Sequence, residues 1–376
     1  MTVTPFRVAI PDPVLDDLRA RLRATRWPDQ IPGTGWDYGT DTATLRDLCA
    51  HWADGFDWRA QEARINAHPQ VRVSLDGFGL HLLRRPAPGP GAIPLLVLHG
   101  WPSSVVQMLP LLAALPEAEA RHGVTFDVVV ASLPGYGFSD IPAAPGMNMA
   151  RAGQVLTGAM RALGFPRFAI RASDVGAGIA RQIALSAPDT VLGLHITGTN
   201  PFLPPVLPPD LDADEQAFVA ATRAWGLAEG GYAQLHTTRP QTLAHALSDS
   251  PAGLAAWIIE KFRAWGDTGG DLYSRFHRDD LLANLTIYWA TGTINSSMRL
   301  YLESVRDPGL PGRVPVPTAV HMGPRDMVPT PRQWAARAYA LDRWTEAEAG
   351  GHFMEWEEPD AVAQDLCATF AARARD

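Results

Sequence analysis

The stretch RFAIRASDVGAGIARQIAL, residues 167–185, decides the fold, because its pattern predicts a buried strand, a sharp turn and a helix. Two reactive side chains, Ser173 and Asp174, are neighbours at the turn. A turn that exposes a nucleophile needs small residues two positions before and after it, because the backbone is crowded there. Asp174 has Ala172 and Gly176 at those positions, whereas Ser173 has an arginine and a valine. The spacing favours Asp174, although on this stretch alone an aspartate that caps the following helix is an equal alternative.

Short apolar runs alternate with helical segments from residue 94 onward. The runs PLLVLHG, FDVVVASLPG, FAIRAS and VLGLHITGT read as strands buried on both faces. This alternation predicts an α/β protein with a mostly parallel sheet. A helical, aromatic-rich region then interrupts the strand pattern before it resumes with PTAVHMG. We therefore predict a core of residues 86–200 and 311–376, an inserted helical lid at 201–310, and an N-terminal extension at 1–85.

Two loops at strand ends add groups that suit acyl chemistry. LHGWP, residues 98–102, follows the first strand of the parallel series, where open α/β sheets bind ligands. A loop there can direct the backbone N–H of Trp101 at an oxyanion, with the N–H of Val175 as its partner. The segment AGGHFMEWEEPD places His352 in a glycine loop after the last strand, where it suits a general base. Asp326 follows the preceding strand and can orient that imidazole. The chain order Asp174, Asp326, His352 is the order of nucleophile, acid and base in α/β-hydrolases.

Composition and charge exclude several classes of function. The net charge of −8 argues against a nucleic-acid or anionic-membrane partner, since no cluster of Lys and Arg is present. Cys49 and Cys367 are too few for a disulfide framework or a metal site, so we expect buried thiols. The N-terminus lacks the pattern of a signal peptide, and no run approaches the ~20 apolar residues of a membrane helix. We expect a cytoplasmic protein.

The chain resembles the microsomal-type epoxide hydrolases, a branch of the α/β-hydrolase fold with its own N-terminal domain. The segments RWPDQIPGTGWDYGTD and FDWRAQEARINAHPQ are similar to that N-terminal domain. LHGWP, SLPGYGFSD, SPAGLAAWIIEKFRAW, YWATGTINSSMRLY and AGGHFMEWEEP are similar to the core and lid. The resemblance covers nearly the whole chain. Mammalian members carry a membrane anchor before this domain, and we expect none here.

The resemblance implies a role for each candidate residue. The implied catalytic set is the nucleophile Asp174, the base His352, the acid Asp326 and the lid tyrosines Tyr232 and Tyr301. The backbone N–H groups of Trp101 and Val175 would form the oxyanion hole, and we expect His99, Pro102 and Val175 to line the substrate pocket. The chain departs from the family at Val175, because a tryptophan usually follows the nucleophile. This change removes a large flat side chain from the pocket wall.

These residue types suit the hydrolysis of an epoxide to a diol. A carboxylate that attacks an sp³ carbon forms an ester that water can cleave, whereas a serine would form a stable ether. We therefore expect an ether-bond hydrolase that acts on a hydrophobic epoxide and uses no metal or organic cofactor. A serine esterase through Ser173 conflicts with the crowding at the turn.

Two alternatives stay open. One is a haloalkane dehalogenase, against which Val175 and the two tyrosines argue. The other is a catalytically silent protein that binds an apolar ligand. The sequence also leaves open whether the N-terminal extension wraps the core or mediates a homodimer.

Overall fold

The fold is built on one nine-stranded sheet. A computed structural model describes residues 1–198, 203–204 and 206–373, and within them the strand order is β1-β2-β3-β5-β4-β6-β7-β8-β9. The strands are β1 (Thr2–Phe6), β2 (Gln70–Leu75), β3 (Phe78–Arg85), β4 (Ile93–Leu98), β5 (Phe126–Ala131), β6 (Phe168–Ser173), β7 (Val191–Thr197), β8 (Val314–Met322) and β9 (Tyr339–Glu346). Strands β1, β2 and β3 pair antiparallel, and β3 pairs antiparallel with β5; the remaining pairs are parallel. The predicted α/β-hydrolase fold with a mostly parallel sheet is confirmed, and β1 forms the edge of the sheet beside β2.

Helices cover both faces of the sheet. The core helices are α4 (Leu109–His122), α5 (Met149–Ala162), α6 (Asp174–Ser186), α13 (Arg332–Ala338), α14 (Met354–Glu357) and α15 (Pro359–Arg373). The crossover from β4 to β5 runs toward one sheet edge, whereas those from β5 to β6 and from β6 to β7 run toward the other. Because parallel crossovers are right-handed, α4 lies on the opposite face from α5 and α6. Accordingly, α4 packs against α15, and α5 packs against α6.

The same topology identifies the end of the sheet where a ligand is expected. The loops after the neighbouring strands β4 and β6 leave the sheet on opposite faces, which makes the carboxyl ends of these two strands its topological switch point. Open α/β sheets bind their ligands at such a switch point. The loop after β4 is residues 99–104, and α6 begins directly after β6 at Asp174.

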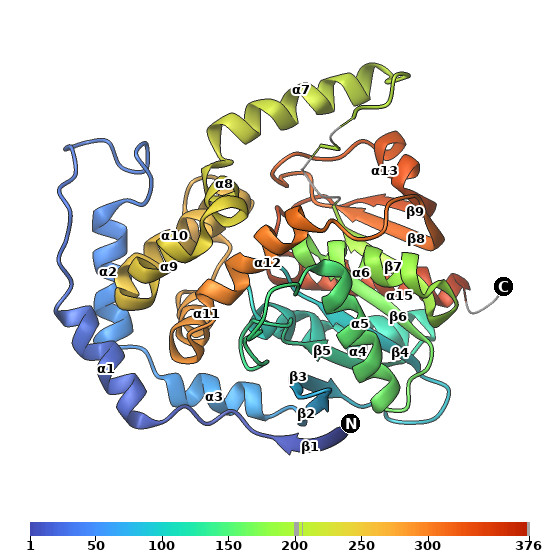
Figure 1. Ribbon diagram of the computed structural model, residues 1–376, viewed down its shortest axis with the longest axis horizontal. Helices are drawn as coiled ribbons and strands as arrows, with labels where there is room; N and C mark the ends of the chain where they lie inside the picture. Colours follow the sequence, from blue (N-terminus) through green and yellow to red (C-terminus); the bar gives the residue numbers. More distant parts are fainter. Residues whose placement is uncertain (199–202, 205, 374–376) are drawn as a thin grey trace.

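A helical lid is inserted between β7 and β8. Within the described residues it contains α7 (Ala213–Ala228), α8 (Gly231–Thr238), α9 (Pro240–Asp249), α10 (Pro251–Trp265), α11 (Arg278–Thr291) and α12 (Ile294–Arg306). Figure 1 shows these helices in yellow to orange beside the sheet, with α7 extending away from the others. The start of the predicted lid includes residues 201, 202 and 205, which lie outside the described residues.

The N-terminal extension braces the lid and also enlarges the sheet. It contains α1 (Asp12–Arg23), α2 (Thr42–Asp54) and α3 (Trp58–Asn66), and α1 and α2 contact α10 while α3 contacts α11. Figure 1 shows α1 and α2, in blue, next to the lid. The Trp52 indole N–H donates to Thr286 Oγ1 at 2.9 Å, and His51 Nε2 lies 2.6 Å from Asp279 Oδ1. Because β1, β2 and β3 belong to the core sheet, the extension and the core share one sheet.

Two further expectations can be compared with the structure. Cys49 and Cys367 are buried free thiols, as predicted. Among the described residues, the apolar stretches of the helices are all too short to span a bilayer.

A buried ion pair joins β6 to the segment after β9. The Arg171 Nη2 group lies 2.9 Å from Glu355 Oε1, and both side chains are fully buried. The Gln107 amide donates to the other Glu355 oxygen at 2.9 Å. Arg171 precedes Asp174 by three residues, and Glu355 follows His352 by three. The pair therefore ties the strand of the candidate nucleophile to the helix after the candidate base.

We expect Arg171→Met to lower the free energy of unfolding by about 3–5 kcal/mol, because the buried Glu355 carboxylate loses its counter-ion. The matched control is Arg121→Met, which breaks the exposed pair with Glu117 and should cost about 1 kcal/mol or less. Urea denaturation of the two variants and the parent chain measures both values. Equal losses in the two variants would contradict a structural role for the buried pair.

Candidate active site

Asp174 lies at a strained turn between β6 and α6. Its φ is +49°, in the left-handed region that non-glycine residues seldom occupy. A Cβ on Gly176 would lie 2.7 Å from the Leu98 carbonyl oxygen and 2.6 Å from the His99 carbonyl oxygen. A Cβ on Gly100 would collide with the Asp174 side chain itself. Residue 176 thus makes the close backbone approach that the sequence predicted for a turn presenting Asp174.

The turn directs the Asp174 carboxylate at the loop after β4. The Trp101 backbone N–H donates to Asp174 Oδ1 at 2.8 Å, as the predicted oxyanion site requires. Val175 occupies the first turn of α6, where N–H groups have no intrahelical acceptor. Within the described residues, its N–H makes no hydrogen bond to the Asp174 carboxylate. The Ser173 hydroxyl is buried and has no hydrogen-bond partner within the described chain.

The structure brings His352 and Asp326 to Asp174, in the arrangement that the sequence predicted. His352 Nδ1 donates to Asp326 Oδ1 at 2.8 Å, which places its proton on that nitrogen. His352 Nε2 lies 3.4 Å from Asp174 Oδ2 but is not aligned with it as a hydrogen bond. An imidazole held in this way presents Nε2 to the space beside the Asp174 carboxylate.

Glu357 holds the backbone on both sides of His352, and the sequence did not single it out. The Gly351 N–H donates to Glu357 Oε2 at 2.9 Å, and the Phe353 N–H donates to Glu357 Oε1 at 2.8 Å. The His352 N–H donates to the Trp265 carbonyl at 2.9 Å, so the loop is also fixed to the lid. The only sequence signal was the run of acidic residues in EWEEP, which reads equally well as a solvated helix start.

The charges around His352 favour its protonated form. Burial alone lowers the pKa of His352, but the carboxylates of Asp326 and Asp174 outweigh burial and raise the pKa to about 10. Since this pKa lies above the ordinary 6.5, the charged triad stabilises the fold fully below pH 6.5. That stabilisation is lost as the pH rises through about 10.

Tyr232 and Tyr301 differ from two other tyrosines near the Asp174 charge. The hydroxyls of Tyr136 and Tyr288 donate to backbone carbonyls at 3.1 and 3.0 Å. Among the described residues, by contrast, neither the Tyr232 nor the Tyr301 hydroxyl makes a hydrogen bond. Burial and the Asp174 charge raise the pKa of both groups well above 10, so both hydroxyls keep their protons. Within the described part of the chain, both are therefore available as donors.

The two tyrosine rings pack around Trp101. The Tyr232 ring stacks on the Trp101 ring with centroids 5.3 Å apart and 7° between the planes. The Tyr301 ring meets Trp101 edge-on, with centroids 6.3 Å apart. The backbone of Trp101 belongs to the oxyanion site, and its side chain packs against the two tyrosines of the lid. Trp101 therefore links the oxyanion site to the lid.

Comparisons with known proteins agree with this geometry. Residues 3–108 match the family model described as epoxide hydrolase N terminus, and residues 93–255 match the α/β hydrolase fold. A putative epoxide hydrolase of Stigmatella aurantiaca is 38% identical over 98% of this chain and 84% of its own. The chain belongs to the epoxide hydrolase family. Epoxide hydrolase 1 of Oryctolagus cuniculus is 30% identical over 97% of this chain and 88% of its own.

Solved structures of epoxide hydrolases share the fold of this chain. The juvenile hormone epoxide hydrolase of Bombyx mori superposes with a TM-score of 0.88 at 28% identity, over 100% of this chain and 94% of its own. The epoxide hydrolase of Aspergillus niger superposes with a TM-score of 0.87 at 29% identity, over 100% and 97% of the two chains.

The predicted pocket residues of this epoxide hydrolase are all buried, and His99 offers no free nitrogen. His99 Nδ1 donates to the Gly100 carbonyl at 2.9 Å, and Nε2 accepts from the Leu133 N–H at 3.4 Å. Burial lowers the pKa of His99 to about 4, so the ring is neutral. These contacts show that His99 supports the loop after β4, and its place in the wall of the substrate pocket stays a prediction. The Pro102 carbonyl likewise accepts the Asn284 amide at 2.8 Å.

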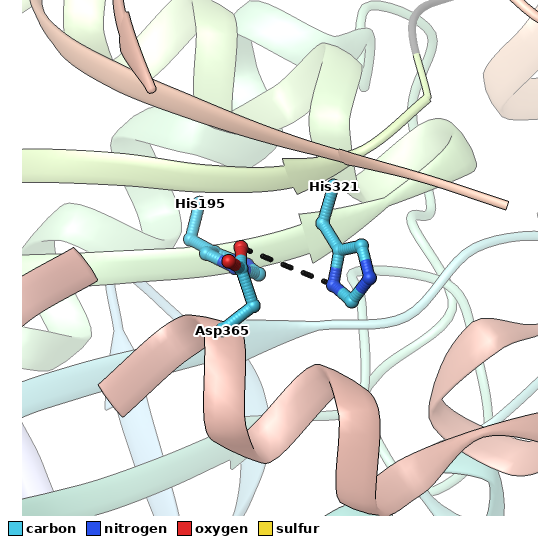
Figure 2. A group of neighbouring side chains, drawn as sticks. All are labelled: His195, His321 and Asp365. Atoms are coloured by element: carbon cyan, nitrogen blue, oxygen red, sulfur yellow. Dashed lines mark hydrogen bonds and ion pairs between the residues drawn. The ribbon is translucent and has the colours of Figure 1, made fainter. Parts of the chain in front are cut away.

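One cluster away from the triad has the composition of a metal site. His195, His321 and Asp365 place three ligand atoms within 4.8 Å of one another, and Figure 2 shows His321 directed at the Asp365 carboxylate. Arg171 donates to His195 Nδ1 at 2.9 Å, so the His195 proton lies on Nε2, which is 2.9 Å from Asp365 Oδ2. A metal needs that nitrogen unprotonated, and metal-bound imidazoles direct their other nitrogen at an acceptor. Arg343 already donates to Asp365 Oδ1. These residues therefore do not fit a metal ion.

We expect Gly176→Ala to lower the free energy of unfolding by about 1–3 kcal/mol, because its Cβ would press against two backbone carbonyls. Gly178→Ala is the matched control on the same helix, since its Cβ would meet the flexible Met149 side chain at 2.5 Å. Helix propensity favours that alanine by about 1 kcal/mol, which offsets the contact. Urea denaturation compares the two. Equal free energies of unfolding for Gly176→Ala and Gly178→Ala would contradict the close approach of residue 176 to the two backbone carbonyls.

We expect Asp174→Asn to lower the pKa of His352, because one of the two carboxylates that raise it loses its charge. The matched control is Asp342→Asn, which removes a surface carboxylate paired with Arg373. NMR titration of the His352 ring, assigned with a His352→Gln variant, measures the pKa in each protein. An unchanged pKa in Asp174→Asn would show that the Asp174 charge does not reach the imidazole.

Proposed function

We propose that this member of the family hydrolyses a hydrophobic epoxide to a vicinal diol through a covalent ester on Asp174. The observation that carries the proposal is the position of the Asp174 carboxylate. One of its oxygens accepts the Trp101 N–H at 2.8 Å, and the other lies 3.4 Å from His352 Nε2. Aromatic rings near it, including Trp101, Tyr232 and Tyr301, support an apolar substrate.

In the first step, an Asp174 carboxylate oxygen attacks an epoxide carbon. The bond between that carbon and the epoxide oxygen breaks, and its electron pair stays on the oxygen. Tyr232 and Tyr301 have free protonated hydroxyls, so they can donate hydrogen bonds or a proton to that oxygen. Alkoxide is a poor leaving group, and this donation is what makes the ring opening accessible. The product of the step is a hydroxyalkyl ester of Asp174.

In the second step, water cleaves the ester at the Asp174 carbonyl carbon. His352 Nε2 removes a proton from the water, and Asp326 stabilises the resulting imidazolium. The tetrahedral oxyanion forms on Asp174, where the Trp101 N–H already donates and the Val175 N–H is available. One such donor is worth about 3 kcal/mol of transition-state stabilisation. The diol leaves, and Asp174 keeps one oxygen from water.

The change in charge at Asp174 sets the order of the two steps. With Asp174 ionised, His352 holds a proton and is not a base. Formation of the ester neutralises Asp174 and removes one of the interactions that raise the pKa of His352. The imidazolium then gives its proton to the phenolate or alkoxide that ring opening leaves, and the neutral imidazole can act as a base on water. Base catalysis is therefore available when an ester is present to be cleaved.

The two alternatives differ from this proposal in what the site must provide. A haloalkane dehalogenase needs donors for a departing halide, commonly including a tryptophan after the nucleophile, and here Val175 follows Asp174. A silent binding protein needs none of the polarised groups around Asp174.

We also propose, from the sequence alone, a cytoplasmic location.

We expect single-turnover hydrolysis in ¹⁸O-water to place the label in the Asp174 carboxylate, because water attacks the ester carbonyl carbon. Digestion and mass analysis of the peptide that contains Asp174 measures the incorporation, with Ser173→Ala as a matched control that should incorporate label equally. Label found only in the diol would overturn the covalent mechanism. Halide release from haloalkanes would favour the dehalogenase instead, and ligand binding without turnover would favour the silent protein.

A further inference from the structure

The chain contains 32 Lys and Arg residues, and a single one of them, Lys261, is a lysine. An ammonium is a compact, strongly hydrated charge that seldom occurs inside a protein. Lys261 nevertheless lies in α10 with only 6% of its surface exposed. The one position at which the chain uses lysine is therefore a buried position in the lid.

The Lys261 ammonium lies among the aromatic rings of the candidate site. Its Nζ is 5.2 Å from the centroid of the Tyr232 ring, 5.9 Å from that of Trp257 and 5.8 Å from that of Trp265. Its ion-pair partner is the neighbouring residue Glu260, whose side chain is more exposed than that of Lys261. Glu260 therefore offsets part of the Lys261 charge from the solvent side. The ammonium also interacts with the faces of the three aromatic rings.

A cation at this distance from a phenol ring interacts more strongly as the ring becomes negative. It is attracted to the π-face of neutral Tyr232, because the ring quadrupole places negative charge on that face. When the Tyr232 hydroxyl gives up its proton, negative charge spreads into the ring, and the attraction to the ammonium increases. An interaction that is stronger in the transition state than in the ground state accelerates the reaction.

We propose that Lys261 is a positioning residue that holds the Tyr232 ring and stabilises negative charge on it during ring opening. This inference rests on the proposed function. The Tyr232 proton moves to the epoxide oxygen as the carbon–oxygen bond breaks, and the electron pair of the O–H bond stays on the phenol, whose ring centroid is 5.2 Å from Lys261 Nζ. The His352 imidazolium then returns a proton to the phenolate, and the proton that His352 later takes from water replaces it. Lys261 itself transfers no proton and does not touch the substrate.

The test is to resolve the two chemical steps in Lys261 variants. Lys261→Met keeps the apolar stem and removes the charge, so rapid-quench single turnover should show ester formation slowed about tenfold. Ester cleavage should change by less than about twofold, because it depends on His352 and the oxyanion site. Lys261→Arg should recover most of the rate of ester formation, because it restores a cation.

The matched control is Arg263→Met on the same helix. The Arg263 guanidinium lies 4.6 Å from the Trp36 ring in the N-terminal extension, so this variant removes a similar cation–aromatic contact away from Tyr232. Both steps should keep their parent rates. Unchanged ester formation in Lys261→Met, or an equal loss in both steps, would overturn the proposal.

A second variant covers the case in which Lys261→Met does not fold. Glu260→Gln removes the counter-ion from a partly exposed position and should make ester formation faster. No change, or a slower step, would contradict the proposal.

A readout without turnover separates this inference from the proposed function. Because the chain has one lysine, ¹³C labelling of lysine Cε gives one side-chain NMR signal. Ring currents from the aromatic neighbours should shift the attached protons upfield, and Tyr232→Leu should reduce that shift. A signal at the position of an exposed lysine would refute the placement of Lys261, whether or not the protein hydrolyses epoxides. A shifted signal without ester formation on any epoxide would refute the proposed function, and with it the role of Lys261.

Discussion

The close approach of two backbone turns, at the carboxyl ends of β4 and β6, is the constraint on which the site depends. A Cβ at Gly176 would overlap the carbonyls of Leu98 and His99, and a Cβ at Gly100 would overlap Asp174. Two glycines thus allow the left-handed Asp174 to lie against the loop after β4, within reach of the Trp101 N–H. Strained residues persist only where the surrounding structure over-determines them. Here that surrounding structure is a pair of parallel strands whose carboxyl-terminal residues are buried.

The geometry of the site depends on the relative positions of three parts of the chain: the core, the lid and the N-terminal extension. The core supplies Asp174, His352 and Asp326, while the lid supplies the two tyrosines and Lys261. The lid is fixed to the loop that carries His352, because the His352 N–H donates to the Trp265 carbonyl. It is also fixed to the N-terminal extension by contacts such as that between Trp52 and Thr286. The extension therefore acts on the site indirectly, by limiting movement of the lid.

Charge in the buried site is balanced differently at each stage of the proposed reaction. In the resting state, the protonated His352 lies between the carboxylates of Asp174 and Asp326. Ester formation removes the Asp174 charge and frees the imidazole to act as a base. Meanwhile, the negative charge on the opened epoxide faces the tyrosines, beside the cation of Lys261. In a low-dielectric pocket such changes of charge act more strongly on neighbouring groups than they would in water.

The sequence by itself determined the features that depend on short-range sterics and on pattern. Small residues at 172 and 176 identified the turn at Asp174, and alternating apolar runs identified the parallel sheet. The tertiary structure alone decided which distant side chains share a partner. It engaged both nitrogens of His99 with backbone, and it placed Glu357 and Lys261 beside groups of the site. It also left the hydroxyls of Tyr232 and Tyr301 without a hydrogen bond to any described residue. The physical reason is that backbone strain arises between adjacent residues, whereas the partners of a buried polar group are set by the packing of segments far apart in the chain.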